Sequence, residues 1–82
     1  MKLLLVSPQS TYEYSVQWIE AWTSSGSLVI KSGHAPLIVT LIPGFEFSFM
    51  LAEEEKKIIQ VTRTGFLEIN RTTATALLSQ EI

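Results

Sequence analysis

The side chains able to carry out chemistry in this chain are few and stand apart. His34 is the only histidine, and the chain has neither cysteine nor aspartate. Catalysis by His34 would need a nucleophile or a carboxylate held beside it, but Gly33 and Pro36 bracket it instead. Zinc needs three or four ligands, which one histidine does not supply. We therefore expect His34 to shape a turn or touch a partner, and we expect no catalytic residue, metal or cofactor.

The run Glu53–Glu55 is the only dense group of carboxylates. It could bind a cation in principle, but Lys56 and Lys57 follow it directly. Such mixed charge is typical of a solvated loop that protects the edge of a hairpin. We therefore expect Glu53–Lys57 to be a hairpin loop. No phosphate-binding loop is expected, because the four glycines are scattered singly.

Trp18 and Trp22 are the remaining side chains with binding potential. They stand four positions apart and share the parity of a strand. Aromatic rings of this kind stack on sugars or nucleotides, anchor protein contacts or fill a core. The sequence leaves open which of the two is buried. One function to test is therefore a free-standing β-sandwich module that binds a peptide or carbohydrate.

The bulk properties describe one small domain over residues 1–82. Hydrophobic residues make up 46% of the chain and its net charge is −2, so no basic field for nucleic acid is present. The apolar run Leu3–Val6 is too short for a secretory signal. Pro43 and Glu46 interrupt the apolar stretch Ala35–Leu51, which predicts two buried strands joined near Pro43 rather than a membrane span. We expect a soluble domain that can dock on a membrane complex.

Alternating apolar residues and frequent turn signals predict an all-β fold, a sandwich or barrel. Phe45, Phe47, Phe49 and Leu51 share one face of a predicted strand. The strand near residue 40 is apolar on both faces, which indicates burial on both or one face reserved for a partner. The alternation from Tyr12 onward loses its phase near Trp18, where we expect a bulge or a change of sheet.

The chain closely resembles the epsilon subunit of F-type ATP synthases along its whole length. The resemblance lies in three motifs: Gly26-x-Leu28-x-Ile30-x-x-Gly33-His34-Ala35-Pro36-Leu37, Thr40-Leu41-x-Pro43-Gly44 and Gly65-Phe66-Leu67-Glu68. Val6-Ser7-Pro8 and Thr75-Ala76-Leu77-Leu78 are similar to the family as well.

This resemblance implies a flattened ten-stranded β-sandwich or barrel of two antiparallel sheets. It also implies a non-catalytic rotor subunit of the central stalk, bound to the gamma subunit and the c ring, with no small-molecule substrate. Such a subunit helps couple ion translocation to ATP synthesis. It lies peripherally at the cytoplasmic face of the energy-transducing membrane.

On this resemblance, we expect partner contacts from loops and neighbouring strand positions. The expected contact residues are Ser7, Ser27, Lys31, His34, Pro36, Leu37, Thr40 and Pro43. Ser27 replaces a glutamate that is usual in the family, and Lys31-Ser32 and Arg63-Thr64 also depart from its pattern. The C-terminal helical hairpin of most members has no counterpart here, so we do not carry over its inhibitory and nucleotide-binding roles.

Overall fold

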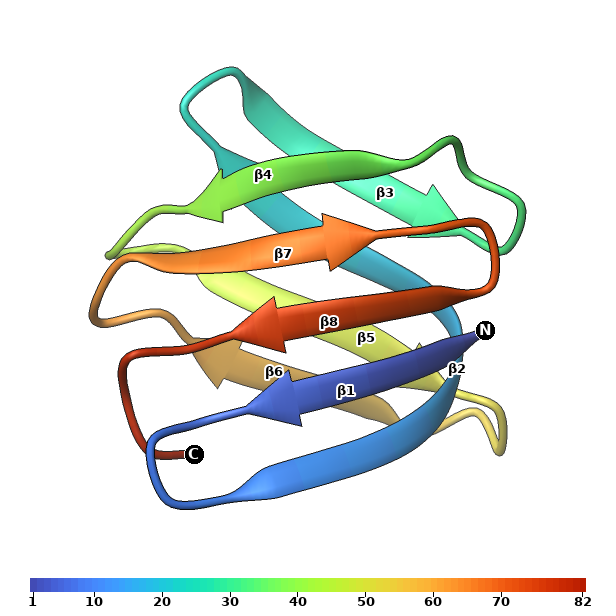
Figure 1. The fold of residues 1–82 in the computed structure, drawn as a ribbon, viewed down its shortest axis with the longest axis horizontal. Helices are drawn as coiled ribbons and strands as arrows, with labels where there is room; N and C mark the ends of the chain where they lie inside the picture. The colour runs from blue at the N-terminus through green and yellow to red at the C-terminus, as the bar shows by residue number, and fades with distance from the viewer.

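The computed structural model describes residues 1–82, and all its regular elements are β-strands. Short turns join eight strands along the chain (Figure 1). Their bounds are β1 Lys2–Val6, β2 Thr11–Thr23, β3 Gly26–Lys31, β4 Leu37–Leu41, β5 Glu46–Leu51, β6 Lys56–Gln60, β7 Gly65–Ile69 and β8 Thr73–Leu77. The structure offers no helix that could cross a membrane. The prediction of an all-β fold is confirmed.

The eight strands form one continuous, mixed sheet. Its order is β4-β7-β8-β1-β2-β5-β6, and β3 pairs with β2. The sheet curls so that β4, β7, β8 and β1 form a front layer and β3, β5 and β6 a back layer (Figure 1). The expectation of ten strands in two antiparallel sheets is wrong, because there are eight strands and β1 runs parallel to β8. The parallel pair arises because β8 returns from its hairpin with β7 in the direction of β1.

Strand β2 joins the two layers. Its first half, up to Ser15, pairs with β1, and its second half, from Trp18, pairs with β3. The register with β5 shifts between Val16 and Trp18, where the strand passes from one layer to the other. Gln17 stabilises this point, because its side-chain amide donates a hydrogen bond to the carbonyl of Leu51 at 3.3 Å. The predicted bulge or change of sheet near Trp18 is confirmed, and both occur there.

The core lies between the layers and is made by alternate residues of the strands. Phe47 and Phe49 of β5 are its largest side chains, with ring centroids 5.9 Å apart. Leu51 also points inward, as its parity predicts, whereas Phe45 precedes the strand and is 43% exposed. Each fully buried side chain of this size contributes about 1.5–3 kcal/mol. The core thereby fixes the two outer faces relative to each other.

Loops rich in glycine and proline connect the layers without adding strands. The segment Gly33–Pro36 links β3 to β4, and Gly33 has a φ of +86°, which favours glycine. Its N–H donates to the carbonyl of Arg71 at 2.8 Å, so the loop is tied to the β7–β8 turn. In the β4–β5 turn, the Gly44 N–H donates to the carbonyl of Val61 at 2.8 Å. These hydrogen bonds fasten the two connections to other parts of the chain, and neither connection adds a strand.

The residues after β8 fasten two turns at one end of the molecule. The Gln80 side chain accepts a hydrogen bond from the Thr62 N–H and donates one to the Gln60 carbonyl, each at 2.7 Å. The Ser7 hydroxyl donates to the Glu81 carboxylate at 3.1 Å. This C-terminal clasp therefore holds the end of β6 and the β1–β2 turn together.

Candidate partner-binding surfaces

His34 lies in the β3–β4 loop, where its Nδ1 is 2.7 Å from the carbonyl oxygen of Ala35. The structure shows no hydrogen bond from His34 to a carboxylate or hydroxyl group. The acidic run forms the exposed turn between β5 and β6, and Glu55 pairs with Lys57 at 3.3 Å. The predicted loop is thus present, although Lys56 and Lys57 already belong to β6. No three histidines or carboxylates lie close enough together to hold a metal ion. The surface is therefore the remaining place to look for function.

The eight expected contact residues do not gather on one surface. Lys31, His34 and Pro36 belong to the β3–β4 loop region, at the end that also carries the N-terminus and the β7–β8 turn (Figure 1). Ser27 and Pro43 follow the β2–β3 turn and β4, respectively, at the opposite end (Figure 1). The structure thus divides these residues between the two ends of the molecule.

The other three expected residues differ in what they offer to a partner. Ser7 is buried, and its one hydroxyl hydrogen is shared between the carbonyl of Ser10, 2.9 Å from Oγ, and the carboxylate of Glu81. Leu37 faces inward from β4 and is half-buried against the core. Thr40 is exposed on the outer face of the same strand. Only Thr40 of these three presents a free side chain on the surface.

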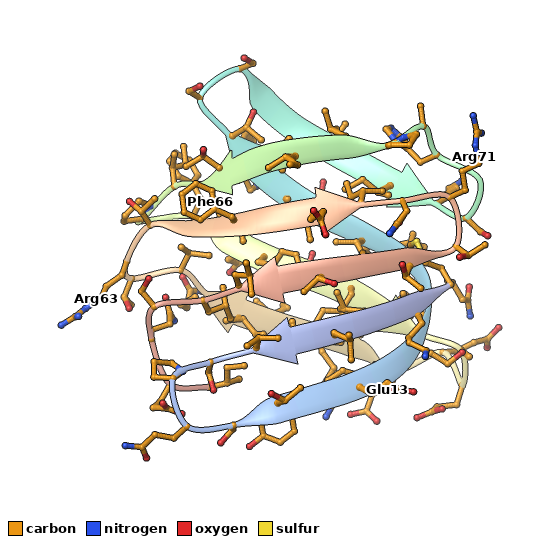
Figure 2. All side chains as sticks on the ribbon, in the orientation of Figure 1. Glu13, Arg63, Phe66 and Arg71 are labelled. Atoms are coloured by element: carbon orange, nitrogen blue, oxygen red, sulfur yellow. The ribbon has the colours of Figure 1, made fainter.

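An apolar patch that sequence reasoning missed covers the outer face of the front layer. The register places Phe66 of β7 opposite Leu77 of β8, and Leu77 opposite Val6 of β1, so the three form a row across the strands. Ile38 of β4 lies diagonally next to Phe66. Ile38 is 67% exposed, Phe66 49% and Leu77 48%, and Figure 2 shows Phe66 on this face. We call Val6, Ile38, Phe66 and Leu77 the front patch.

The front patch has the layout of a contact surface. Its apolar row is bordered by Glu68, and the ion pair of Lys2 with Glu13, whose Nζ and Oε2 atoms are 3.9 Å apart, lies farther along the same face. Clustered apolar side chains with a polar rim mark sites of protein association. The sequence signal was the strand near residue 40, which is apolar on both faces. The exposure of Ile38 shows that one of these faces is uncovered.

A second, aromatic patch lies on the outer face of the back layer. Trp18 and Trp22 both point outward from β2, so neither belongs to the core. The ring of Trp22 stacks on Phe45, with centroids 5.3 Å apart. Val29 of β3 and Ile58 of β6 are exposed on the same face. We call these five residues the back patch.

A shallow pocket of about 290 Å³ opens within the back patch. Its walls are Trp18, Glu20, Val29 and Lys31. The ammonium group of Lys56 lies 5.8 Å from the ring centroid of Trp18, a distance at which a cation is attracted to the ring. Neither Glu20 nor Lys31 takes part in an ion pair. The structure thus brings expected contact residue Lys31 together with Trp18.

Comparison with known proteins gives both a family and a fold. A sequence model described as ATP synthase, Delta/Epsilon chain, beta-sandwich domain matches residues 1–80. A chain of the Euglena gracilis mitochondrial ATP synthase, in a structure of OSCP/F1/c-ring in rotational state 1, has a TM-score of 0.86 and 19% identity over 98% of this chain. A chain of the Tetrahymena thermophila mitochondrial ATP synthase, in a structure of central stalk/c-ring, has a TM-score of 0.78 and 19% identity over 98% of this chain.

The two comparisons carry different weight. At 19% identity, the solved structures show that the fold is shared. The chain spans 51% of the Euglena chain and 63% of the Tetrahymena chain. The family match, by contrast, covers nearly every residue, including all eight strands. The chain therefore belongs to the family of the ATP synthase delta/epsilon chain β-sandwich domain.

Proposed function

We propose that this chain is a non-catalytic subunit of the central stalk of an F-type ATP synthase. In this role it binds the gamma subunit and the c ring, and it helps couple ion movement through the ring to ATP synthesis. The observation that carries the proposal is the family match over residues 1–80. The shared fold with chains from two ATP synthase assemblies supports it. The complex would hold the subunit at the cytoplasmic face of the energy-transducing membrane.

The surface of the domain is consistent with a role in assembly. The front patch and the back patch lie on opposite layers, and a packed core holds them at a fixed separation. A rigid body with two uncovered apolar faces can contact more than one neighbour at once. We therefore propose the front patch as the main protein contact, because its apolar row is continuous across three strands.

The loop residues expected to contact partners remain part of this proposal. Since Ser27 and Pro43 lie at one end and Lys31, His34 and Pro36 at the other, one end alone can face the ring (Figure 1). Cross-linking from a cysteine placed at Ser27 or at Lys31 would show which end faces the ring. Cross-links to the c subunit are expected from one of these positions and not from both.

Association with the stalk is the direct test of the proposed function. The isolated domain is expected to bind a purified gamma–c-ring assembly in native mass spectrometry. Phe66→Asp should weaken this binding about tenfold or more, because it places a charge in the front patch. Phe66→Leu keeps the site apolar and should bind nearly as the unaltered domain does. If the unaltered domain does not associate at all, the proposed function is refuted.

The pocket beside Trp18 keeps a second function open, a module that binds a carbohydrate or peptide. The Trp18 ring offers a stacking surface, and Glu20 and Lys31 offer an acceptor and a donor on the pocket walls. Trp22 is less suited to stacking on a ligand because it already stacks on Phe45. Binding to a glycan or peptide array that Trp18→Ala abolishes, with no affinity for the stalk assembly, would favour this function.

A further inference from the structure

The free edge of β4 differs from the other free edges of the sheet. β3, β4 and β6 each pair with a strand on one side only, and the first half of β2 pairs with β1 alone but carries the charged Glu13. β3 ends in Lys31, and β6 begins with Lys56 and Lys57 and has its Gln60 carbonyl bonded by Gln80. Lysines at an edge discourage the addition of another strand. β4 contains no charged residue, so its edge lacks this protection.

The hydrogen-bond pattern identifies which groups of β4 are free. The Asn70 N–H donates to the Thr73 carbonyl, so this pair begins the alternation of bonded pairs between β7 and β8. By alternation, Phe66 and Glu68 bond to β8, whereas Gly65, Leu67 and Ile69 bond to β4. The partners of those residues in β4 are the odd-numbered positions. The N–H and C=O groups of Ile38 and Thr40 therefore point away from β7, on the side where β4 pairs with no strand.

The inner side of the same edge is also incompletely covered. Leu37 and Val39 of β4 face the core but are only half-buried. Leu28, which faces inward from β3, is half-buried as well. β3 and β4 are not paired, and Figure 1 shows them at the same margin of the two layers. These three half-buried side chains lie along the unpaired margin between β3 and β4, which we call the seam.

We propose that the free edge of β4 accepts an extended segment of a central-stalk partner as an added strand. The inference rests on the proposed function and names how the partner is held. The added strand would bond to the backbone of Ile38 and Thr40. Its alternate side chains would extend the front patch on the outside and cover Val39 and Leu28 in the seam.

The surroundings define the chemistry of the incoming segment. Because the edge is uncharged and both of its sides are apolar, the segment carries uncharged, apolar residues at alternate positions. Pro36 and Pro43 flank β4 and have no N–H to donate. They limit the pairing to about the length of β4 itself. Ile38 belongs both to this edge and to the front patch, so the two contacts form one continuous surface.

A proline substitution tests the edge selectively. Thr40→Pro removes the outward N–H and blocks an added strand, yet it removes no bond to β7. Thr40→Val keeps the N–H and the shape of the side chain. Binding to the gamma–c-ring assembly should weaken about tenfold or more for Thr40→Pro and remain nearly unchanged for Thr40→Val. Circular dichroism of both variants checks that they fold.

Amide hydrogen exchange in the unaltered domain gives a readout that does not depend on a variant. In the free domain, the Ile38 and Thr40 amides should exchange quickly, while those of Leu37, Val39 and Leu41 are protected. On binding the assembly, the two fast amides should become protected.

The results separate this inference from the proposed function. If the unaltered domain binds but its Ile38 and Thr40 amides stay unprotected, or if Thr40→Pro folds and binds as well as Thr40→Val, the β4 edge is not the contact and the stalk role stands. If the unaltered domain does not bind, the stalk role fails and this inference fails with it. Protection of these amides together with selective weakening by Thr40→Pro supports both.

Discussion

Gly65 shows how closely single residues of the front layer approach each other. A Cβ atom at this position would lie 2.8 Å from the carbonyl oxygen of Leu77 and 3.2 Å from the Cδ2 atom of Leu78. The first of these contacts is to backbone, which the β7–β8 ladder holds in place. A glycine is therefore needed at position 65 for β7 to approach β8 this closely.

Gly65→Ala should therefore destabilise the domain. We expect a loss of about 1–3 kcal/mol in the free energy of unfolding, because strands must separate to admit the methyl group. Urea unfolding followed by tryptophan fluorescence measures it. Thr64→Ala, at the exposed neighbouring position, is the control and should change stability by less than about 0.5 kcal/mol. Equal stability of the two variants would mean that the strands separate to admit the methyl group without any loss in the free energy of unfolding.

Residue parity predicted the core better than it predicted the surface. Phe47 and Phe49 alternate with Glu46 and Ser48, so their inward orientation followed from the sequence, and Leu51 continues the same parity. In β4, both parities are apolar, and parity alone does not say that Ile38 is the exposed side. For Trp18, the bulge reverses the phase of β2, and the sequence placed the bulge but not the face that follows it.

At the scale of elements, the C-terminal clasp fastens the connection between β6 and β7. Gln80 bonds the carbonyl of Gln60, where β6 ends, and the N–H groups of Thr62 and Arg63 within the connection. The segment itself has no regular structure. One side chain thus holds the connection through three hydrogen bonds.

Removing the Gln80 side chain should loosen this connection. Gln80→Ala is expected to cost about 1–2 kcal/mol, because it leaves three backbone groups without their partner, although water reaches them in part. The Thr62 amide should also exchange faster, which NMR measures directly. Gln9→Ala removes an exposed glutamine side chain and should leave both quantities unchanged. Unaltered exchange at Thr62 in Gln80→Ala would show that the clasp does not hold the connection.

The strands and turns could be predicted from the sequence, whereas the pairing of strands that are far apart in the chain could not. Pro43 and the Glu53–Glu55 run marked the turns around β5, and the structure has turns there. The parallel pairing of β1 with β8 joins opposite ends of the chain. No turn residue encodes such a pairing, and the family pattern of two antiparallel sheets did not indicate it. The front patch was missed for the same reason, since β1, β7 and β8 build it together.

At the scale of the whole molecule, β8 connects the front layer. It lies between β7 and β1 in the sheet order, so β4 and β7 reach the rest of the sheet through it. Its inward residues Ala74 and Ala76 are buried in the core. The last strand of the chain is therefore an internal strand of the sheet.

A chain that ends at Asn70 should consequently fail to fold. Without β8, the β4–β7 pair loses its ladder to β1, and we expect no cooperative unfolding transition in urea. A chain lacking only Ile82, which is exposed, should unfold as the complete chain does. A cooperative transition in the shorter chain would show that the back layer and β1 form a stable unit without β8.

The continuity of β2 through both layers has a mechanical consequence. Two stacked plates resist sliding only through the contacts between them, but here a covalent backbone runs from one plate into the other. A load applied to one face therefore reaches the other along peptide bonds as well as through packing. At the opposite margin, β3 and β4 are connected by a loop but form no ladder, so the two layers share no strand there. We therefore expect the layers to shear more easily on that side, where a loop takes the place of a shared strand.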